Sequence, residues 1–233
     1  MNKTTFKLNN YDIDLYVNNL DSLKELPLFI LNSYKNEKID EVIDSIKGKY
    51  NFIFLDIKVN DWSETLTPYK VPDNGIYLRN LDGKGENHLR FIDDTLIPYI
   101  KDHLSKYNIN ISKYILLGYS LAGLFAVFAG LKSKYINIIT SISGSLWYPN
   151  LINYINDISF NNNIEFIYLS LGDNEKKTKN EYMKYVEVNT LKLFEAFKSI
   201  YKNVYFEFNK GNHFARSNER VIKALYYLFN NVI

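Results

Sequence analysis

The sequence contains no cysteine. This absence excludes disulfide bonds, thiolate metal sites and a cysteine nucleophile, so any covalent catalysis must use another residue type. The net charge is also small, at +2, and the lysines are scattered among acidic residues. Proteins that bind nucleic acid or anionic membranes have strongly basic surfaces, so we expect neither nucleic acid nor a membrane as a partner.

Long apolar runs are missing as well. No stretch approaches the roughly 18 apolar residues that span a bilayer, and the first residues, MNKTTFKLNNYDIDLYV, lack the apolar core of a signal peptide. We therefore expect a cytoplasmic protein. Hydrophobic residues still make up 46% of the 233 positions, which is enough for the core of a single domain spanning 1–233. The oligomeric state does not follow from the sequence.

Short apolar runs rich in β-branched and aromatic residues alternate with longer helical patterns. This alternation is typical of α/β proteins with a doubly wound, mostly parallel sheet and helices on both faces. Residues 1–20 hold two weaker strands around Asn9-Asn10, which predicts an N-terminal hairpin. The runs that predict core strands are LPLFILN (26–32), YNFIFLDI (50–57), YILLG (114–118), INIITSIS (136–143), IEFIYLSLG (164–172) and VYFEF (204–208).

Helical patterns cover residues 86–105, 120–131, 178–201 and 217–229. Pro98 should kink the first helix, and Thr178 is a candidate N-cap of the third. Residues 58–85 hold two prolines and three glycines. We interpret them as an excursion outside the sheet, near the active site, because long loops of this kind often form the wall of a site.

The segment YILLGYSLAGLFAVFAG (114–130) places a serine between a strand and an apolar helix. A strained turn at such a junction needs small neighbours, which Gly118 and Ala122 provide, although Ala122 departs from the usual G-x-S-x-G pattern. The helix N-terminus can stabilise an oxyanion. Ser120 is therefore the candidate nucleophile and the Leu121 amide the candidate oxyanion donor, while the same residues would also suit an ordinary tight turn.

A serine nucleophile needs a base, and the chain has only three histidines. His103 lies in a polar stretch and is expected in solvent, and His88 is expected at the surface or in a cap. His213 lies in a glycine-containing loop between the last predicted strand and the last helix, at the sheet edge where sites form in doubly wound proteins. His213 is therefore the candidate base.

The acid of a triad should follow the strand at 164–172, because α/β-hydrolases carry nucleophile, acid and histidine in that order. It would accept the second imidazole N–H and stabilise the imidazolium. The loop reads Gly172-Asp173-Asn174-Glu175. Asp173 and Glu175 both qualify by position, and at least one of them is a solvated loop carboxylate.

Four segments together resemble one family: GYSLAGLFAVFAG (118–130), SGSLWYP (143–149), LGDNEKKTKN (171–180) and GNHF (211–214). They are similar to the α/β-hydrolase esterases that include the enterobactin and salmochelin esterases and relatives of esterase D. The similarity extends over most of the chain from residue 26 onward. These motifs are specific for the family and not for a substrate.

The resemblance implies Ser120 as nucleophile, His213 as base and Glu175, in a G-x-x-E/D pattern, as acid. Asp173 is the alternative acid, and some relatives work with a serine-histidine dyad. The resemblance also implies the Ser33 amide as second oxyanion donor. It further places two substrate-binding residues beside the nucleophile, Ser145 and Trp147, although a large aromatic there also suits a core.

The expected function is hydrolysis of a small-molecule carboxylic ester through an acyl-enzyme, with a siderophore as one candidate substrate. This chemistry needs no metal or organic cofactor, and the sequence has no clustered His/Cys ligand set. Two alternatives remain: an acyltransferase using the same triad, and a catalytically silent binding module on the same fold.

Overall fold

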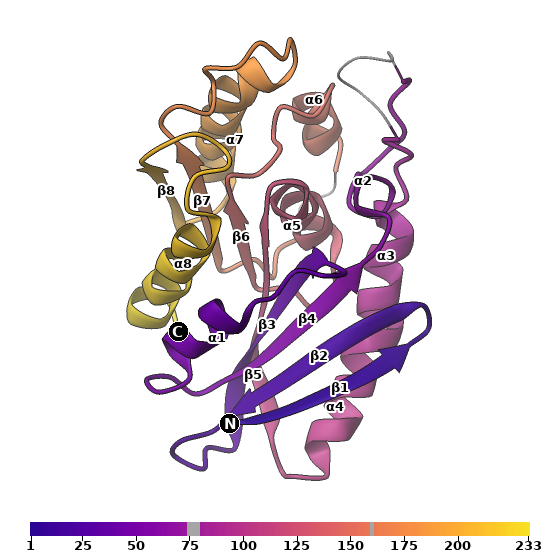
Figure 1. The fold of residues 1–233 in the computed structure, drawn as a ribbon, viewed down its shortest axis with the longest axis vertical. Helices are drawn as coiled ribbons and strands as arrows, with labels where there is room; N and C mark the ends of the chain where they lie inside the picture. The colour runs from indigo at the N-terminus through magenta and orange to yellow at the C-terminus, as the bar shows by residue number, and fades with distance from the viewer. Residues whose placement is uncertain (74–79, 159–160) are drawn as a thin grey trace.

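The structure is a computed structural model that describes residues 1–73, 80–158 and 161–233. Within these ranges, eight strands form one sheet with the order β1-β2-β4-β3-β5-β6-β7-β8 (Figure 1). The strands from β4 to β8 pair in parallel, whereas β1, β2 and β4 pair antiparallel. This arrangement confirms the predicted α/β class. The strand bounds are β1 (Asn2–Leu8), β2 (Tyr11–Asn18), β3 (Glu25–Tyr34), β4 (Phe52–Val59), β5 (Asn110–Tyr119), β6 (Ile138–Ile142), β7 (Phe166–Gly172) and β8 (Val204–Asn209).

Helices cover both faces of the sheet. On one face α1 and α8 lie side by side (Figure 1). They pack against aromatic and aliphatic side chains of the central strands. The other face is covered by α3, α4, α5 and α7. Each face therefore has its own apolar core, as a doubly wound sheet requires. The helix bounds are α1 (Asp40–Ile46), α2 (Trp62–Thr65), α3 (Gly85–Phe91), α4 (Ile97–Ser105), α5 (Leu121–Lys132), α6 (Leu151–Asn156), α7 (Val186–Ile200) and α8 (Ser217–Asn231).

Helix α5 is buried on every side from Leu121 to Leu131. A helix that is apolar all round must lie inside the molecule, and α5 packs against β5 and β6 and contacts α3. Because β5 ends at Tyr119 and α5 begins at Leu121, Ser120 alone makes the sharp turn between them. The fold thus holds this serine on two rigid elements.

The predicted start of the third helix was wrong. The helix predicted from residue 178 begins at Val186, after a 3₁₀ turn η2 (Met183–Tyr185). Thr178 does not cap it; instead the side-chain oxygen of Asn180 accepts the amide protons of Tyr182 and Met183, which ties the segment into a turn before the helix. Pro98 lies in the first turn of α4, directly after a π-helical turn η1 (Ile92–Leu96), and the kink expected at this residue stays a prediction.

The region predicted as an excursion contains the end of β4, helix α2 and the start of α3. Residues 74–79 of this region, including Gly75, lie outside the described residues. β1 and β2 form the antiparallel hairpin expected near the N-terminus. No helix in the described ranges is long and apolar enough to cross a membrane.

Candidate active site

Three strands bring the candidate triad together. Ser120 follows β5, Glu175 follows β7 and His213 follows β8, and the carboxyl ends of these parallel strands meet at one edge of the sheet. The Nε2 atom of His213 lies 3.0 Å from the Ser120 Oγ, and its Nδ1 lies 2.8 Å from the Glu175 Oε2. Both separations are hydrogen-bond distances, so serine, imidazole and carboxylate form one continuous chain.

Ser120 has a strained backbone, with φ 59° and ψ −123°. Positive φ is uncommon for residues other than glycine and is often found at functional turns. Gly118 makes the turn possible, because a Cβ atom there would lie 2.3 Å from the backbone of Ala122. The space that Gly118 leaves open also explains why Ala122 is accepted where the usual pattern has glycine. Gly123 is needed as well, since its Cβ would lie 2.8 Å from the Cα of Gly144.

The two candidate oxyanion donors differ in position: Leu121 lines the described cleft and Ser33 does not. Leu121 is the first residue of α5 and lines the cleft beside Ser120, so its amide belongs to the free N-terminus of a helix. Ser33 is buried within β3, and its hydroxyl donates to Asp56 and accepts from Lys58. Its neighbour Tyr34 lines the described cleft, and Ser33 does not.

Glu175 is 7% exposed. Burial alone would raise the pKa of its carboxyl group, but hydrogen bonds from His213 and from the Gly172 amide outweigh burial and hold the pKa below its usual value. The carboxylate is therefore ionised at neutral pH. An ionised acid in this position can accept the second imidazole N–H of His213 and stabilise an imidazolium.

Asp173 does not contact His213. Its Oδ1 accepts the amide proton of Gly211 at 2.9 Å and a side-chain proton of Asn174 at 2.8 Å. Asp173 thus links the loop after β7 to the loop that carries His213. Of the two candidate acids, the structure brings only Glu175 to the imidazole.

Arg220, on α8, is a residue of the site that sequence reasoning missed. It is 3% exposed, and its guanidinium lies 2.8 Å from the Glu175 Oε1. The sequence carried one signal for it: Arg220 directly precedes Val221, where the buried apolar face of α8 begins. A charged side chain beside such a face needs a buried partner.

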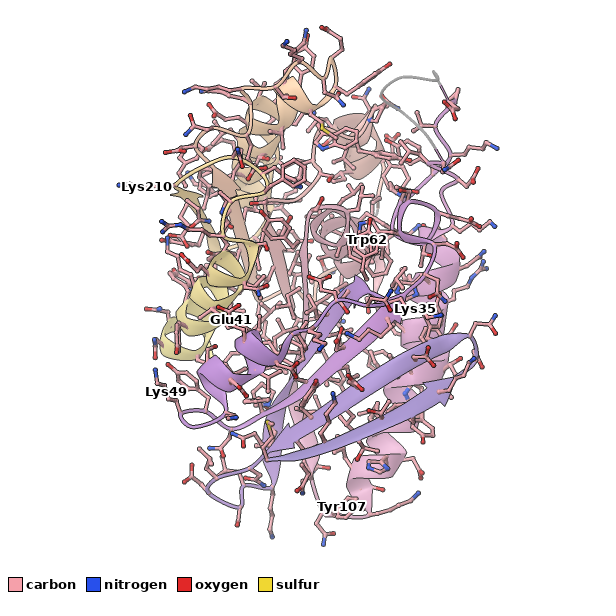
Figure 2. All side chains as sticks on the ribbon, in the orientation of Figure 1. Lys35, Glu41, Lys49, Trp62, Tyr107 and Lys210 are labelled. Atoms are coloured by element: carbon pink, nitrogen blue, oxygen red, sulfur yellow. The ribbon has the colours of Figure 1, made fainter. Side chains whose placement is uncertain are left out.

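A cleft of about 490 Å³ opens in front of Ser120 and His213. Trp147 and Ser145 both line it, and the Ser145 Oγ lies 3.4 Å from the Ser120 Oγ. On another wall Tyr34 stacks on Trp62, labelled in Figure 2, with 4.2 Å between ring centroids. The apolar residues that line the cleft are Tyr34, Trp62, Leu81, Leu121, Trp147, Met183, Val186 and Phe214.

The prediction for His88 was wrong. This histidine is 1% exposed rather than at the surface, and its ring nitrogens lie within hydrogen-bond distance of the Tyr11 hydroxyl and the Asn32 side chain. Burial lowers the pKa of His88 to about 3, so the ring is neutral. His103 lies on α4 and contacts Tyr107. Neither residue lines the described cleft, and the described ranges contain no group of His, Asp and Glu that could hold a metal ion.

Comparisons with known proteins address the fold. No family model matches the chain. The uncharacterized protein YbbA of Bacillus subtilis (strain 168) is 24% identical over 190 residues, which is 79% of this chain and 70% of that protein. Among solved structures, an IroE-like serine hydrolase from Shewanella oneidensis has a TM-score of 0.78 at 14% identity and covers 98% of this chain and 80% of its own. The siderophore hydrolase EstB from Aspergillus nidulans has a TM-score of 0.76 at 16% identity, over 97% of this chain and 94% of its own.

The chain has the α/β-hydrolase fold. In this fold the nucleophile follows a central strand and the acid and the histidine come from later strands. Ser120, Glu175 and His213 stand in that order along the chain. The likeness extends over nearly the whole chain and concerns architecture, because sequence identity to these structures is low.

Proposed function

We propose that this protein is a serine esterase that hydrolyses a small-molecule carboxylic ester. One observation carries the proposal: His213 lies within hydrogen-bond distance of both Ser120 and Glu175, and all three residues line one cleft. Its Nε2 lies 3.0 Å from the Ser120 Oγ and its Nδ1 lies 2.8 Å from the Glu175 Oε2. A serine hydroxyl is a weak nucleophile until a base takes its proton. The strained turn at Ser120 and the buried acid add support, because both cost stability and are common at catalytic sites.

The proposed reaction has two steps. Ser120 attacks the ester carbonyl while His213 takes its proton, and the resulting imidazolium is stabilised by Glu175. The Leu121 amide donates to the oxyanion. His213 then returns the proton to the leaving alcohol, which leaves an acyl group on Ser120. A water molecule, deprotonated by His213, then attacks the acyl carbonyl; the bond to the Ser120 Oγ breaks, His213 returns the proton to that oxygen, and the acid is released.

The proposed substrate is an acyl ester with a substantial apolar group. Support comes from the aromatic walls of the cleft, where Trp147 and Phe214 lie beside the triad and the side chain of Phe214 is 90% exposed. Lys177 is the only lysine or arginine among the described lining residues. Within this class, a siderophore ester is the more specific candidate substrate, because a structural neighbour named above is a siderophore hydrolase.

A substrate panel tests the proposal. Purified protein is assayed against p-nitrophenyl esters of increasing acyl length, aryl esters and siderophore lactones, with the Ser120→Ala variant as control. We expect hydrolysis that the variant lacks, with free acid as the product. Formation of a new ester from an added alcohol, in place of free acid, would reassign the protein as an acyltransferase. Absence of turnover on all these esters would favour a binding module.

A further inference from the structure

Arg220 contacts residues at the carboxyl ends of four neighbouring strands, β5, β6, β7 and β8. Its Nη1 lies 2.8 Å from Glu175 Oε1, 2.8 Å from Ser143 Oγ and 3.3 Å from the Tyr119 hydroxyl. Tyr119 ends β5, Ser143 directly follows β6 and Glu175 lies in the loop after β7. The Nη2 atom donates to the backbone carbonyls of Lys210 and Asn212, at 3.1 and 2.8 Å, in the loop after β8.

The guanidinium therefore contacts two groups that position the imidazole. It holds the carboxylate that orients His213, and it holds two carbonyls of the loop that carries His213. The Tyr119 hydroxyl adds a third link, because it donates to the backbone carbonyl of His213 and accepts from Arg220. Lys210, labelled in Figure 2, contributes its backbone carbonyl here while its side chain is exposed.

Gly172, which has no side chain, leaves room for the contact between Arg220 and Glu175. A Cβ atom on Gly172 would lie 2.8 Å from the Arg220 Nη2 and 2.8 Å from the Glu175 Oε1. Real Cβ atoms do not approach polar atoms so closely, so a side chain at this position would displace one of them. Gly172 also donates its amide proton to Glu175 at 2.7 Å. The close approach of three groups requires glycine at this point.

We propose that Arg220 is a positioning residue of the triad, which fixes the Glu175 carboxylate and the His213 loop in one arrangement through its planar fork of donors. The inference rests on the proposed esterase function. Charge alone does not account for the contacts, because only one of the five acceptors is a carboxylate. A guanidinium offers donors in a rigid fork that an ammonium cannot reproduce.

A kinetic test separates positioning from general structural support. Arg220 does not line the cleft, so Arg220→Met should lower kcat by on the order of 100-fold while KM changes less than about threefold. Arg220→Lys, which keeps the charge but not the fork, should lose about tenfold. Arg216→Met is the matched control: Arg216 directly precedes the same helix, is exposed and pairs with Glu219, so the kcat of this variant should equal that of the wild type.

A double-mutant cycle asks whether Arg220 acts through the acid. In a Glu175→Gln background, Arg220→Met should lower kcat by much less than it does alone, because the carboxylate that it positions is already gone. Losses that multiply, or a KM that rises with an unchanged kcat, would overturn the proposal. If Arg220→Met does not fold, Arg220→Lys decides the question, and a wild-type kcat in that variant would overturn it.

A substrate-free measurement keeps this test distinct from that of the esterase function. The His213 Nδ1 lies 2.8 Å from the Glu175 Oε2, so the NMR signal of the proton between these two atoms reports directly on how the carboxylate is held. This signal should shift or broaden in Arg220→Met and keep its wild-type position in Arg216→Met. An unchanged signal in Arg220→Met would contradict the proposal even if the protein hydrolysed no ester.

Discussion

Glu175 and Asp173 lie two residues apart in one loop, yet their carboxylates have different partners. Glu175 Oε2 lies 2.8 Å from the His213 Nδ1, whereas Asp173 Oδ1 accepts the Gly211 amide proton at 2.9 Å. The division of roles follows from side-chain length and direction. Glu175 folds back over Gly172 into the protein, and Asp173 remains exposed at the surface.

This pair gives the first prediction. Glu175→Gln should lower turnover by about 10-fold or more relative to Asp173→Asn, because an amide cannot stabilise the imidazolium as a carboxylate does. Asp173→Asn is a matched control, since its remaining side-chain oxygen can still accept from Gly211. Steady-state kinetics of the two folded variants provide the measurement. The reverse ranking would assign the role to Asp173, and wild-type turnover in both would indicate a serine-histidine dyad.

His213, the proposed base, gives the second prediction. His213→Ala should lose about 10³-fold or more in kcat, the scale seen when a triad member is removed. His103→Ala is the control, because His103 lies on α4 and does not line the described cleft. Turnover is compared after circular dichroism has shown both variants to be folded. Wild-type kcat in His213→Ala would remove this residue from the mechanism.

The turn at Ser120 gives the third prediction. A methyl group on Gly118 would lie 2.3 Å from the Ala122 backbone, so Gly118→Ala must shift β5 or α5. We expect a loss of about 1–3 kcal/mol in the free energy of unfolding, as for other overpacked sites, together with a loss of esterase activity. Gly48→Ala is the control, since no atom lies within 4 Å of a Cβ there. Equal stability of the two variants in urea unfolding would show that the turn is not tightly packed.

The buried histidine gives the fourth prediction. Because burial lowers the pKa of His88 to about 3, its ring should not titrate between pH 5 and 8. Its folded-state pKa lies below the unfolded value of about 6.5. Its contribution to stability is therefore complete above that value and falls as the pH drops toward 3. NMR of the ring protons, assigned with a His88→Gln variant, tests this, and a midpoint near 6.5 would show that the ring is accessible to solvent.

Much of the fold could be predicted because its signals are local. The six core strands are short apolar runs that the alternation with helices makes visible, and each of them overlaps a strand of the structure. The start of α7 was missed because the polar segment before it also suits a helix. There the side-chain oxygen of Asn180 accepts hydrogen bonds from two backbone amides, which stabilises a turn instead of a helix.

The parts that could not be predicted depend on contacts between distant residues. His88 is buried because its partners Tyr11 and Asn32, which lie 77 and 56 residues away in the sequence, meet it in the fold. Arg220 likewise reaches Glu175 across 45 residues. Serine, histidine and the acidic loop could be proposed from their order at strand ends, whereas the choice between Glu175 and Asp173 required side-chain geometry.

Labelling with a fluorophosphonate tests the central claim most directly, because the probe reacts only with a serine that has an adjacent base and an oxyanion site. Intact mass spectrometry and peptide mapping would count and locate the modified serines in the wild type and in Ser120→Ala. Ser145→Ala serves as the nearby control, since its hydroxyl lies 3.4 Å from that of Ser120. The account predicts one modification, at Ser120, that persists in Ser145→Ala and vanishes in Ser120→Ala. Undiminished labelling of Ser120→Ala, or no labelling of the wild type, would contradict it.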